Sequence, residues 1–303
     1  MRRAPIYIGF LFGLAAFVAA LTPLTTLAQQ KPDILEVLEI NGEIHGGMVP
    51  GIAEAVDKIN DNAKVKAVLL IVDTPGGSVT ASSAIYEDLS RLKVPVVVWC
   101  GSLCASGGVY VAMAPSVKWI AVRSETIGGS VGVVMQMMRF NRLLEWAKID
   151  PKTYRSGLLK DAGNPMRAQE EAEDKYLQGI VSELAEKFYA IVAKSRGSKI
   201  KNWDEIKTAR IFIGQEAVRV GLADAVATKA EVTAKAKELS GSKSIFTREE
   251  LKKMSSAADG HSTYAAPAIQ PNVWGDTAWL IETAKEIMGG GSVKFSYRLE
   301  HKF

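Results

Sequence analysis

The sequence predicts an α/β protein built on a mostly parallel sheet, with peripheral helices. Strand patterns alternate with helical patterns along the chain, which is the order found in βαβ units. Two of the expected strands are continuous apolar runs, as in strands covered on both faces, and each leads through a glycine-rich turn into a helix. The expected strands are 34–40, 67–72, 94–99 and 117–122, and the expected helices are 51–59, 79–92, 108–113, 140–147, 168–194 and 231–239.

The composition is that of an ordinary globular protein. The chain has 303 residues, of which 48% are hydrophobic and 23% charged, so there is ample material for a core. The formal net charge is +4, and it falls to +2 without the first 28 residues, which contain Arg2 and Arg3 and no acid. A charge this small and this dispersed argues against a nucleic-acid partner, which would require a concentrated basic face.

The N-terminus has the layout of a secretory signal. A positive start at Arg2 and Arg3 precedes the apolar run 6–21, and Thr26-Leu27-Ala28 offers small residues for cleavage. The run is close to the ~20 residues of a membrane span, so an uncleaved N-terminal anchor is the alternative to a signal peptide in 1–28. Either way, we expect the body of the protein to be exported, in the periplasm or on the extracytoplasmic face of a membrane.

The rest of the chain divides by composition into a body and a tail. Residues 32–240 carry all the strong strand and helix patterns and are expected to form one domain. Residues 241–303 are rich in Ser, Ala, Pro and Gly and are expected to be a weakly structured tail. Cys100 and Cys104 are too few for a disulfide framework. A disulfide between them is possible in an oxidising compartment, but so short a loop gains little stability, and we expect two buried thiols. Nothing in the sequence indicates a metal or a cofactor.

Two glycine-rich turns follow the two apolar strands and are the candidate functional elements. The segment 73–78, Asp-Thr-Pro-Gly-Gly-Ser, comes at the carboxyl end of the strand 67–72, the edge at which open α/β sheets bind ligands. Ser106, Gly107 and Gly108 follow the next strand. Either turn alone is also explained by packing. Together they supply one serine and two sets of backbone N–H groups for a developing oxyanion, which favours acyl transfer.

A nucleophilic serine needs a base, and the histidines are poorly placed for that role. They are His45, His261 and His301. None follows shortly after Ser106, so a Ser-His-Asp triad is not expected. The remaining candidate is Lys160, in the polar, glycine-bounded segment 156–165. Most loop lysines are solvated and charged, and Asp161 beside it would favour the charged form if the two met.

Three stretches, taken together and in this order, resemble the SppA family of signal peptide peptidases. They are 73–77, 104–111 and 156–165, and two further stretches, 126–133 and 212–217, match more loosely. The resemblance covers roughly residues 34–235. It implies a crotonase/ClpP-like spiral of ββα units, with Ser106 as the nucleophile and Lys160 as the general base of a Ser-Lys dyad.

The resemblance also implies roles for three further residues. Ser130 occupies the place of a serine that hydrogen-bonds the lysine, and Gly77 and Gly107 match the backbone oxyanion donors. The family usually has Thr where this sequence has Gly128, so local detail beside Ser130 is expected to differ.

The expected function is therefore that of a serine endopeptidase at the membrane. It would degrade hydrophobic peptides such as cleaved signal peptides, within a homo-oligomeric ring or dome whose active sites are shared between subunits. One alternative is a crotonase-type acyl-CoA enzyme, against which the export signal argues. The other is a catalytically inactive SppA-like scaffold, against which the joint presence of Ser106 and Lys160 argues.

Overall fold

The computed structural model describes residues 32–258 of the chain. Contacts divide the described residues into a large unit, 36–241, and a small unit made of 32–35 and 242–258. The predicted signal peptide or anchor in 1–28 and the part of the tail from 259 onward lie outside the described residues. Among the described helices, none is both long enough and apolar enough to cross a membrane.

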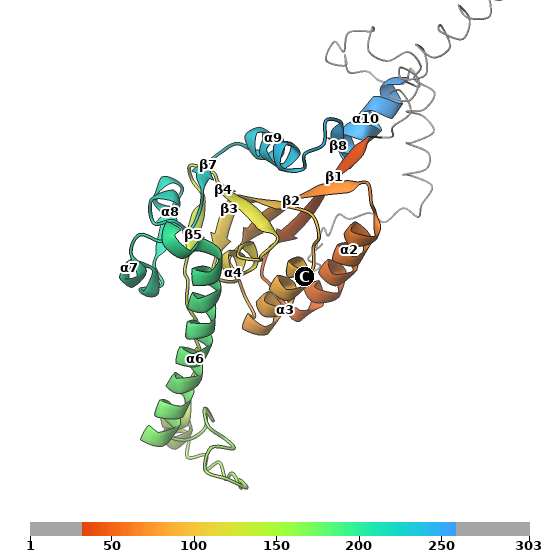
Figure 1. The fold of residues 1–303 in the computed structure, drawn as a ribbon. Helices are drawn as coiled ribbons and strands as arrows, with labels where there is room; N and C mark the ends of the chain where they lie inside the picture. The colour runs from red at the N-terminus through yellow and green to blue at the C-terminus, as the bar shows by residue number, and fades with distance from the viewer. Residues whose placement is uncertain (1–31, 259–303) are drawn as a thin grey trace, which may run out of the picture. The chain divides into compact units, whose positions relative to one another are not determined.

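A mostly parallel sheet forms the centre of the large unit (Figure 1). Along the main path the strands lie in the order β6-β5-β3-β2-β1. The first half of β3 pairs with β4, and its last three residues pair with β5, so both strands share one edge of β3. In this unit β3 is parallel to β2, β4 and β5, and β4 is parallel to β7, whereas β5 and β6 are antiparallel. The strands are β1 (Asp33–Asn41), β2 (Val65–Thr74), β3 (Val96–Ala105), β4 (Val117–Val122), β5 (Ile127–Gly129), β6 (Ile211–Ile213) and β7 (Ala225–Val226).

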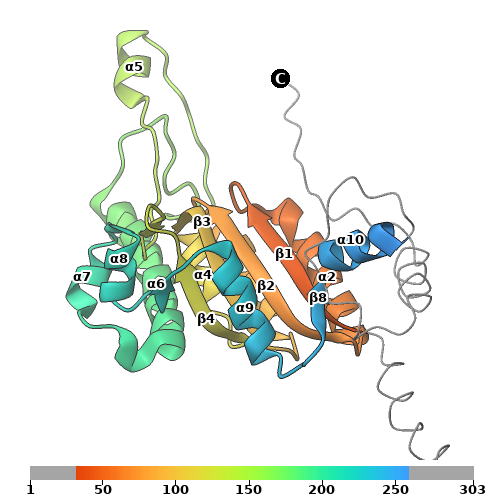
Figure 2. The ribbon, with the colours of Figure 1, turned by 90° about the horizontal axis from the view of Figure 1, so that it is seen from above.

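Helices cover both faces of this sheet. In Figures 1 and 2, α9 lies on one face and α2, α3 and α4 lie on the other. The apolar runs Ala67–Val72 and Val96–Val98 are therefore buried from both sides, as their sequence predicts. The helices of these layers are α2 (Val49–Asp61), α3 (Val79–Ser90), α4 (Gly107–Ala112) and α9 (Lys229–Leu239).

Residues 130–170 form a projecting segment that leads into the long helix α6 (Glu171–Arg196), and this helix ends against the sheet. Figure 2 shows the chain leaving the body after β5, forming the short helix α5 (Asn141–Trp146) and returning to α6. In the second half of α6, the Phe188 ring packs on Tyr110 of α4 with centroids 4.9 Å apart. The short helices α7 (Trp203–Lys207) and α8 (Gln215–Arg219) follow, with 3-10 turns at Gly46–Met48 and Gly197–Lys199.

The small unit is organised by β8 (Ile245–Thr247), which pairs in parallel with the first three residues of β1, and by α10 (Arg248–Ala258). Ser244 accepts a hydrogen bond from the backbone N–H of Asp33, and the Ser242 hydroxyl donates to the Asp33 carboxylate. Residues 241–303 were expected to be weakly structured. Residues 245–258 instead form β8 and α10, and β8 forms by pairing with β1, which is far away in the sequence.

A buried ion pair holds the end of α6 against the sheet. The Arg196 guanidinium, 4% exposed, forms two hydrogen bonds of 3.0 Å with the carboxylate of Asp224 and a third with the carbonyl of Gly221. The same carboxylate accepts from the backbone N–H of Ile120 in β4 and from the ammonium of Lys199. Burial alone would raise the pKa of the Asp224 carboxyl, but these hydrogen bonds, led by Arg196, hold the pKa below its ordinary value.

We expect Arg196→Ala to lower the free energy of unfolding by about 3–5 kcal/mol, because it removes the buried partner of the Asp224 carboxylate and leaves it only the exposed Lys199 as a cation. Lys199→Ala is the matched control. It removes a cation from the same carboxylate, but its side chain is 52% exposed, so the expected loss is at most about 1 kcal/mol. Urea denaturation at pH 7 measures both.

The pH dependence of this difference has a definite sign. Because folding lowers the pKa of Asp224, the contribution of its charge to the free energy of unfolding is complete at neutral pH and is lost as the pH falls below about 4. The difference in free energy of unfolding between wild type and Arg196→Ala should therefore become smaller in acid. Equal losses for the two variants at pH 7 would contradict this account of the pair.

Candidate active site

The two glycine-rich turns lie against each other at the carboxyl edge of the sheet. One follows β2 and the other follows β3, and these strands are direct neighbours. A Cβ atom added to Gly76 would lie 2.6 Å from the backbone nitrogen of Gly107 and 2.7 Å from the Cβ of Ser106. Gly76 also has φ +97°, a conformation that other residues rarely adopt. Only glycine fits at this position, because the two backbones approach this closely.

A bulge in β3 places the turn at Ser106 against Gly76. Val72 of β2 pairs with Cys100, but Thr74, two residues later, pairs with Cys104, so β3 holds two extra residues here. The Asp73 carboxylate accepts a hydrogen bond of 2.9 Å from the backbone N–H of Leu103 inside the bulge. The buried Thr126 hydroxyl donates to the carbonyl of Gly101 at 2.6 Å. These contacts fix where β3 ends.

Ser106 occupies a strained position directly before α4. Its backbone has φ 51° and ψ −115°, which is unusual for a residue with a side chain. Its N–H donates to the carbonyl of Gly129 at 2.8 Å, and its carbonyl accepts from the N–H of Tyr110, so the strain is held from both sides. The side chain is half-buried, and within the described chain its hydroxyl has no hydrogen-bond partner. The geometry presents a serine hydroxyl on a sharp strand-to-helix turn.

The first turn presents backbone N–H groups at the surface. Ile44, in the loop after β1, donates to the carbonyl of Gly76 at 2.7 Å and accepts from the N–H of Ser78 at 2.8 Å. Neither bond uses the N–H of Gly77, which lies between them on an exposed residue. The N–H of Gly107 begins α4 and has no carbonyl four residues before it within the helix. The two turns together offer donors suited to an oxyanion.

Ser130 lies in register with Ser106. The parallel pairing of β3 with β5 matches Ala105 to Gly129, and one serine follows each strand. Like Ser106, Ser130 has a positive φ, 52°, and its N–H donates to the carbonyl of Arg210. The structure therefore brings Ser106, Ser130, Gly77 and Gly107 to one edge of the sheet.

The structure does not bring Lys160 to this edge within one chain. Lys160 is exposed and lies in the projecting segment, whose charged side chains contact Glu173 in the first turn of α6. The contact of α6 with α4 is made by Phe188, fifteen residues farther along the helix. At 1.5 Å per residue these two points are about 22 Å apart, well beyond the reach of a lysine side chain. In Figure 1, α6 extends from the body, where α4 lies, into the projecting part of the chain.

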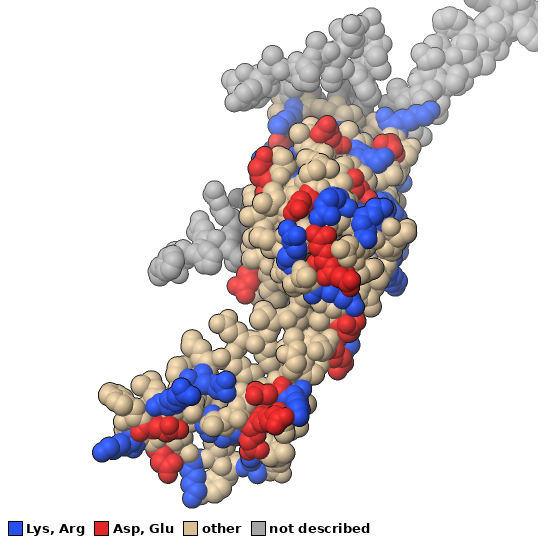
Figure 3. All heavy atoms as spheres, turned by 90° about the vertical axis from the view of Figure 1, so that its left-hand side faces the viewer, with Lys and Arg blue, Asp and Glu red and all other residues tan. Residues whose placement is uncertain are grey.

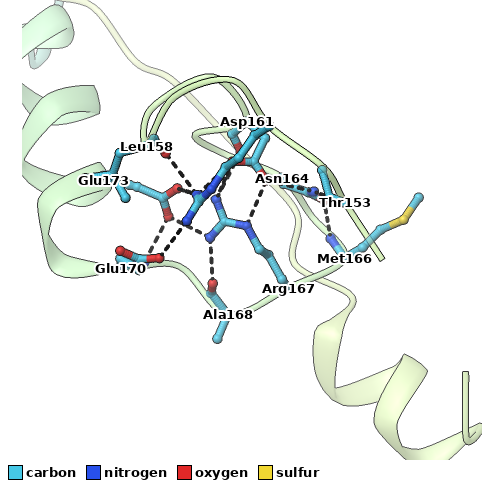
Figure 4. Close-up of polar contacts among 10 residues, drawn as sticks. Thr153, Leu158, Asp161, Asn164, Met166, Arg167, Ala168, Glu170 and Glu173 are labelled. Carbon is cyan, nitrogen blue, oxygen red and sulfur yellow. Dashed lines mark hydrogen bonds and ion pairs between the residues drawn. The ribbon is translucent and has the colours of Figure 1, made fainter. Parts of the chain in front are cut away.

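Sequence reasoning missed a group of charged side chains that surrounds the residue next to Lys160. Figure 4 shows the carboxylates of Asp161 and Glu173 on either side of the guanidinium of Arg167. The only signal in the sequence was the alternation of acids and arginines between 155 and 173, and such a pattern is usually a solvated surface.

Cys100 and Cys104 are free, buried thiols, as the sequence analysis expected. The bulge brings their sulfur atoms to 2.7 Å. The hydrogen bond with Cys104, together with burial, raises the pKa of the Cys100 thiol well above its ordinary value. Among residues 32–258 there is also no cluster of three or more His, Cys, Asp or Glu side chains arranged to hold a metal ion.

Comparisons with known proteins match two peptidase families. The profile of peptidase family S49 matches residues 88–243, and the profile of the Clp proteases matches residues 35–127. The sheet topology and the Clp protease match confirm the predicted fold class, a ClpP-like α/β fold with a mostly parallel sheet and peripheral helices. A mutant of ClpP1 from Listeria monocytogenes aligns with a TM-score of 0.44 and 13% identity, over 65% of this chain and 93% of that one.

Two curated relatives share about a third of their aligned residues with this chain. "Putative protease slr0021" of Synechocystis is 34% identical over 67% of this chain and 73% of its own length. "Putative signal peptide peptidase SppA" of Enterococcus faecium is 35% identical over 56% of this chain, which spans only 49% of that protein. The resemblance to the SppA family is thereby confirmed, and the chain belongs to peptidase family S49.

Proposed function

We propose that this chain is a serine endopeptidase in which Ser106 is the nucleophile. The observation that carries the proposal is the strained backbone of Ser106 directly before α4. Its hydroxyl has no hydrogen-bond partner among residues 32–258, and the N–H groups of two turns lie beside it. A side chain held in this way resembles the nucleophile elbow of other hydrolases, in which a sharp strand-to-helix turn exposes the hydroxyl. Membership of a peptidase family supports peptide bonds as the target.

The proposed chemistry follows from the groups at the sheet edge. The Ser106 Oγ attacks the scissile carbonyl carbon while a base removes its proton. The carbonyl oxygen becomes an oxyanion, which the backbone N–H groups of Gly77 and Gly107 stabilise. The base then passes the proton to the leaving amine, and water cleaves the acyl-enzyme by the reverse sequence. Lys160 is the proposed base, and the Ser130 hydroxyl is the proposed partner that orients it.

Lys160 is proposed to act on the serine of a neighbouring subunit. Within one chain, the segment that carries it contacts α6 at Glu173, about 22 Å along the helix from Phe188, which contacts α4. A dyad in the same subunit would therefore require the projecting segment to refold. A shared site needs an oligomer, and the projecting segment has the surface for one. Its exposed apolar side chains are unusual for a monomer. They include Val134, Met138, Phe140, Leu143, Trp146, Ile149, Tyr154 and Leu158.

The distribution of charge supports the same assembly. Figure 3 shows charged side chains of both signs at the lower end of the molecule, with a largely uncharged stretch between them and the body. An interface core of this kind is depleted in charge and rimmed by polar residues. The proposed assembly is a closed homo-oligomeric ring or dome, in which each projecting segment reaches its neighbour.

The proposed substrates are hydrophobic peptides, such as cleaved signal peptides, at a membrane. The support is the signal or anchor pattern in residues 1–28 and the printed name of the Enterococcus relative, a signal peptide peptidase. Apolar peptides released at a membrane would meet an exported enzyme that is held on its extracytoplasmic face.

Mixing inactive subunits tests the shared dyad. Ser106→Ala and Lys160→Ala should each lower kcat/KM for a peptide by at least ~1000-fold, because a nucleophile and its base act as a unit. Reassembled in equal amounts, they should recover about a quarter of the wild-type activity, since one interface in four pairs an intact serine with an intact lysine. A mixture that exchanges subunits, as judged by native mass spectrometry, yet stays inactive would place the dyad within one chain.

The matched control mixes wild type with the Ser106→Ala/Lys160→Ala double variant. With shared sites this mixture should also retain about a quarter of the activity, whereas sites within one chain would retain about a half. The two mixtures together therefore separate the two arrangements without depending on the absolute recovery.

Gly76→Ala tests the contact between the turns. The new methyl group would collide with Gly107 N and Ser106 Cβ, so we expect kcat to fall at least ~100-fold, as when an oxyanion donor is lost. Gly42→Ala is the control: Gly42 also has a positive φ, +76°, but nothing lies within 4 Å of its added Cβ. Both variants place a side chain at a positive φ, but only the Gly76→Ala methyl group collides with neighbouring atoms. Labelling of Ser106 by a fluorophosphonate, a serine-reactive probe, reads the effect, and equal labelling of both variants would contradict it.

Residues 1–28 determine location in this proposal. The full chain, expressed in a bacterial host, should fractionate with the extracytoplasmic face of the membrane or with the periplasm. A chain that begins at residue 29 should remain in the cytosol. Protease protection in spheroplasts distinguishes these compartments, and full-length protein in the cytosolic fraction would refute the export proposal.

A further inference from the structure

Glu173 is a buried charge at an otherwise exposed helix end. Its side chain is fully buried, whereas those of Glu171 and Lys175 in the same turns of α6 are 82% and 76% exposed. Charged side chains are almost never fully buried without partners. The cover comes from the projecting segment, which folds back over the first turn of α6.

Arg167 joins this carboxylate to that of Asp161. Its Nε and Nη2 atoms donate to the two oxygens of Asp161, both at 2.9 Å, in a bidentate pair. Its Nη1 and Nη2 atoms also donate to the two oxygens of Glu173. Hydrogen bonds from Arg167, and then from Arg155, hold the pKa of the Asp161 carboxyl far below its ordinary value.

Lys160 is the residue immediately before Asp161. A succession of turns winds the chain here, with backbone hydrogen bonds from Lys160 to Gly157, from Ala162 to Leu159 and from Asn164 to Asp161. Fixing the Asp161 side chain therefore fixes the backbone that carries the lysine. Within the described part of the chain, the Lys160 ammonium has no hydrogen-bond or ion-pair partner.

We propose that Arg167 is a positioning residue for Lys160, which fixes the lysine-bearing turn to α6 and keeps the neighbouring Asp161 carboxylate away from the lysine. This inference rests on the proposed function, in which Lys160 is the base. A carboxylate that pairs with an ammonium stabilises the protonated form, and a protonated lysine cannot accept the proton of a serine. Arg167 thus keeps the carboxylate nearest to Lys160 in the sequence, that of Asp161, from pairing with the lysine.

The other charged groups near Asp161 do not replace Arg167. Arg155 donates one hydrogen bond to Asp161 and is also bonded to the carbonyl of Leu158 and to the carboxylate of Glu170. Lys152 lines the same 310 Å³ cavity as Asp161, and no hydrogen bond joins the two. On the α6 side, Glu170 and Glu173 supply only negative charge. Without Arg167, one hydrogen bond from Arg155 and a weak one from Asn164 would remain to restrain the Asp161 carboxylate.

The test is the pH–activity profile of Arg167→Ala. We expect its midpoint to move upward by about half a pH unit, because the released Asp161 carboxylate stabilises the lysine's ammonium. The double variant Arg167→Ala/Asp161→Asn should bring the midpoint back to the wild-type value while kcat stays below wild type, since Asn keeps the shape and loses the charge. Should Arg167→Ala be inactive, Arg167→Lys carries the measurement, with a smaller shift in the same direction.

Two variants serve as controls. Lys175→Ala removes a positive charge from the same end of α6 and should leave the midpoint unchanged, since its partner Glu171 is exposed. Glu173→Gln keeps the bidentate pair between Arg167 and Asp161, and its midpoint should also stay in place.

Two results would overturn the proposal. The first is a loss of activity in Arg167→Ala with an unmoved midpoint, which would mean that the arginine has only a structural role. The second is a shift that persists in the double variant, which would mean that Asp161 is not its cause. Failure of the proposed function is recognised separately, because Lys160→Ala would then keep its activity.

Discussion

The close approach of two backbone turns is the constraint on which the candidate site depends. No side chain fits between Gly76 and the Ser106–Gly107 peptide, so the ends of β2 and β3 meet directly. Neighbouring elements hold this contact from several directions. Ile44 bonds to both sides of the first turn, and the carbonyl of Gly129 holds the second. The buried Ser82 of α3 lies against Gly107 and leaves no room for a larger residue there.

The length of α6 sets the second feature of the molecule, the separation between the serine and the lysine. The helix contacts the body through Phe188 and carries the charged turn at its other end. In a chain with this geometry, the proposed nucleophile Ser106 and the proposed base Lys160 are out of reach of each other. In the proposed assembly, association of subunits is therefore the step that creates activity. A single subunit released during synthesis or export would not cleave its surroundings.

The sequence predicted the layers of the fold because long apolar runs and helical periodicity are local signals. The strands at 67–72 and 117–122 and the long helix α6 are present with small differences at their ends. The strands β5, β6 and β7 were not predicted, since two or three residues show no periodicity and form only by pairing with distant partners. The extension of β3 beyond residue 99 was also missed. Gly101 and Ser102 indicate a loop, and only the contacts of Asp73 and Thr126 make them a bulge.

The candidate site could be read from the sequence in part, for a similar reason. The turn at Gly76 and the turn at Ser106 each follow an apolar strand, so their meeting at one sheet edge follows from parallel pairing. The position of Lys160 cannot be predicted in the same way, because the position of a loop depends on how the helix after it packs. From the sequence, Asp161 was considered only as a neighbour that would favour the charged form of Lys160. In the structure, the Asp161 carboxylate pairs with Arg155 and Arg167 instead. No local sequence pattern distinguishes a pairing with these arginines from a pairing with Lys160.

The atoms that hold Ser106 in place belong largely to the main chain. Its N–H, its carbonyl and the turn beside it are fixed by the backbone groups of Gly129, Tyr110 and Ile44. Side chains can therefore change around this serine without altering its backbone hydrogen bonds, provided that the glycines at the contact remain. The geometry of this turn therefore constrains the sequence mainly at a few glycines, which act through their backbone alone.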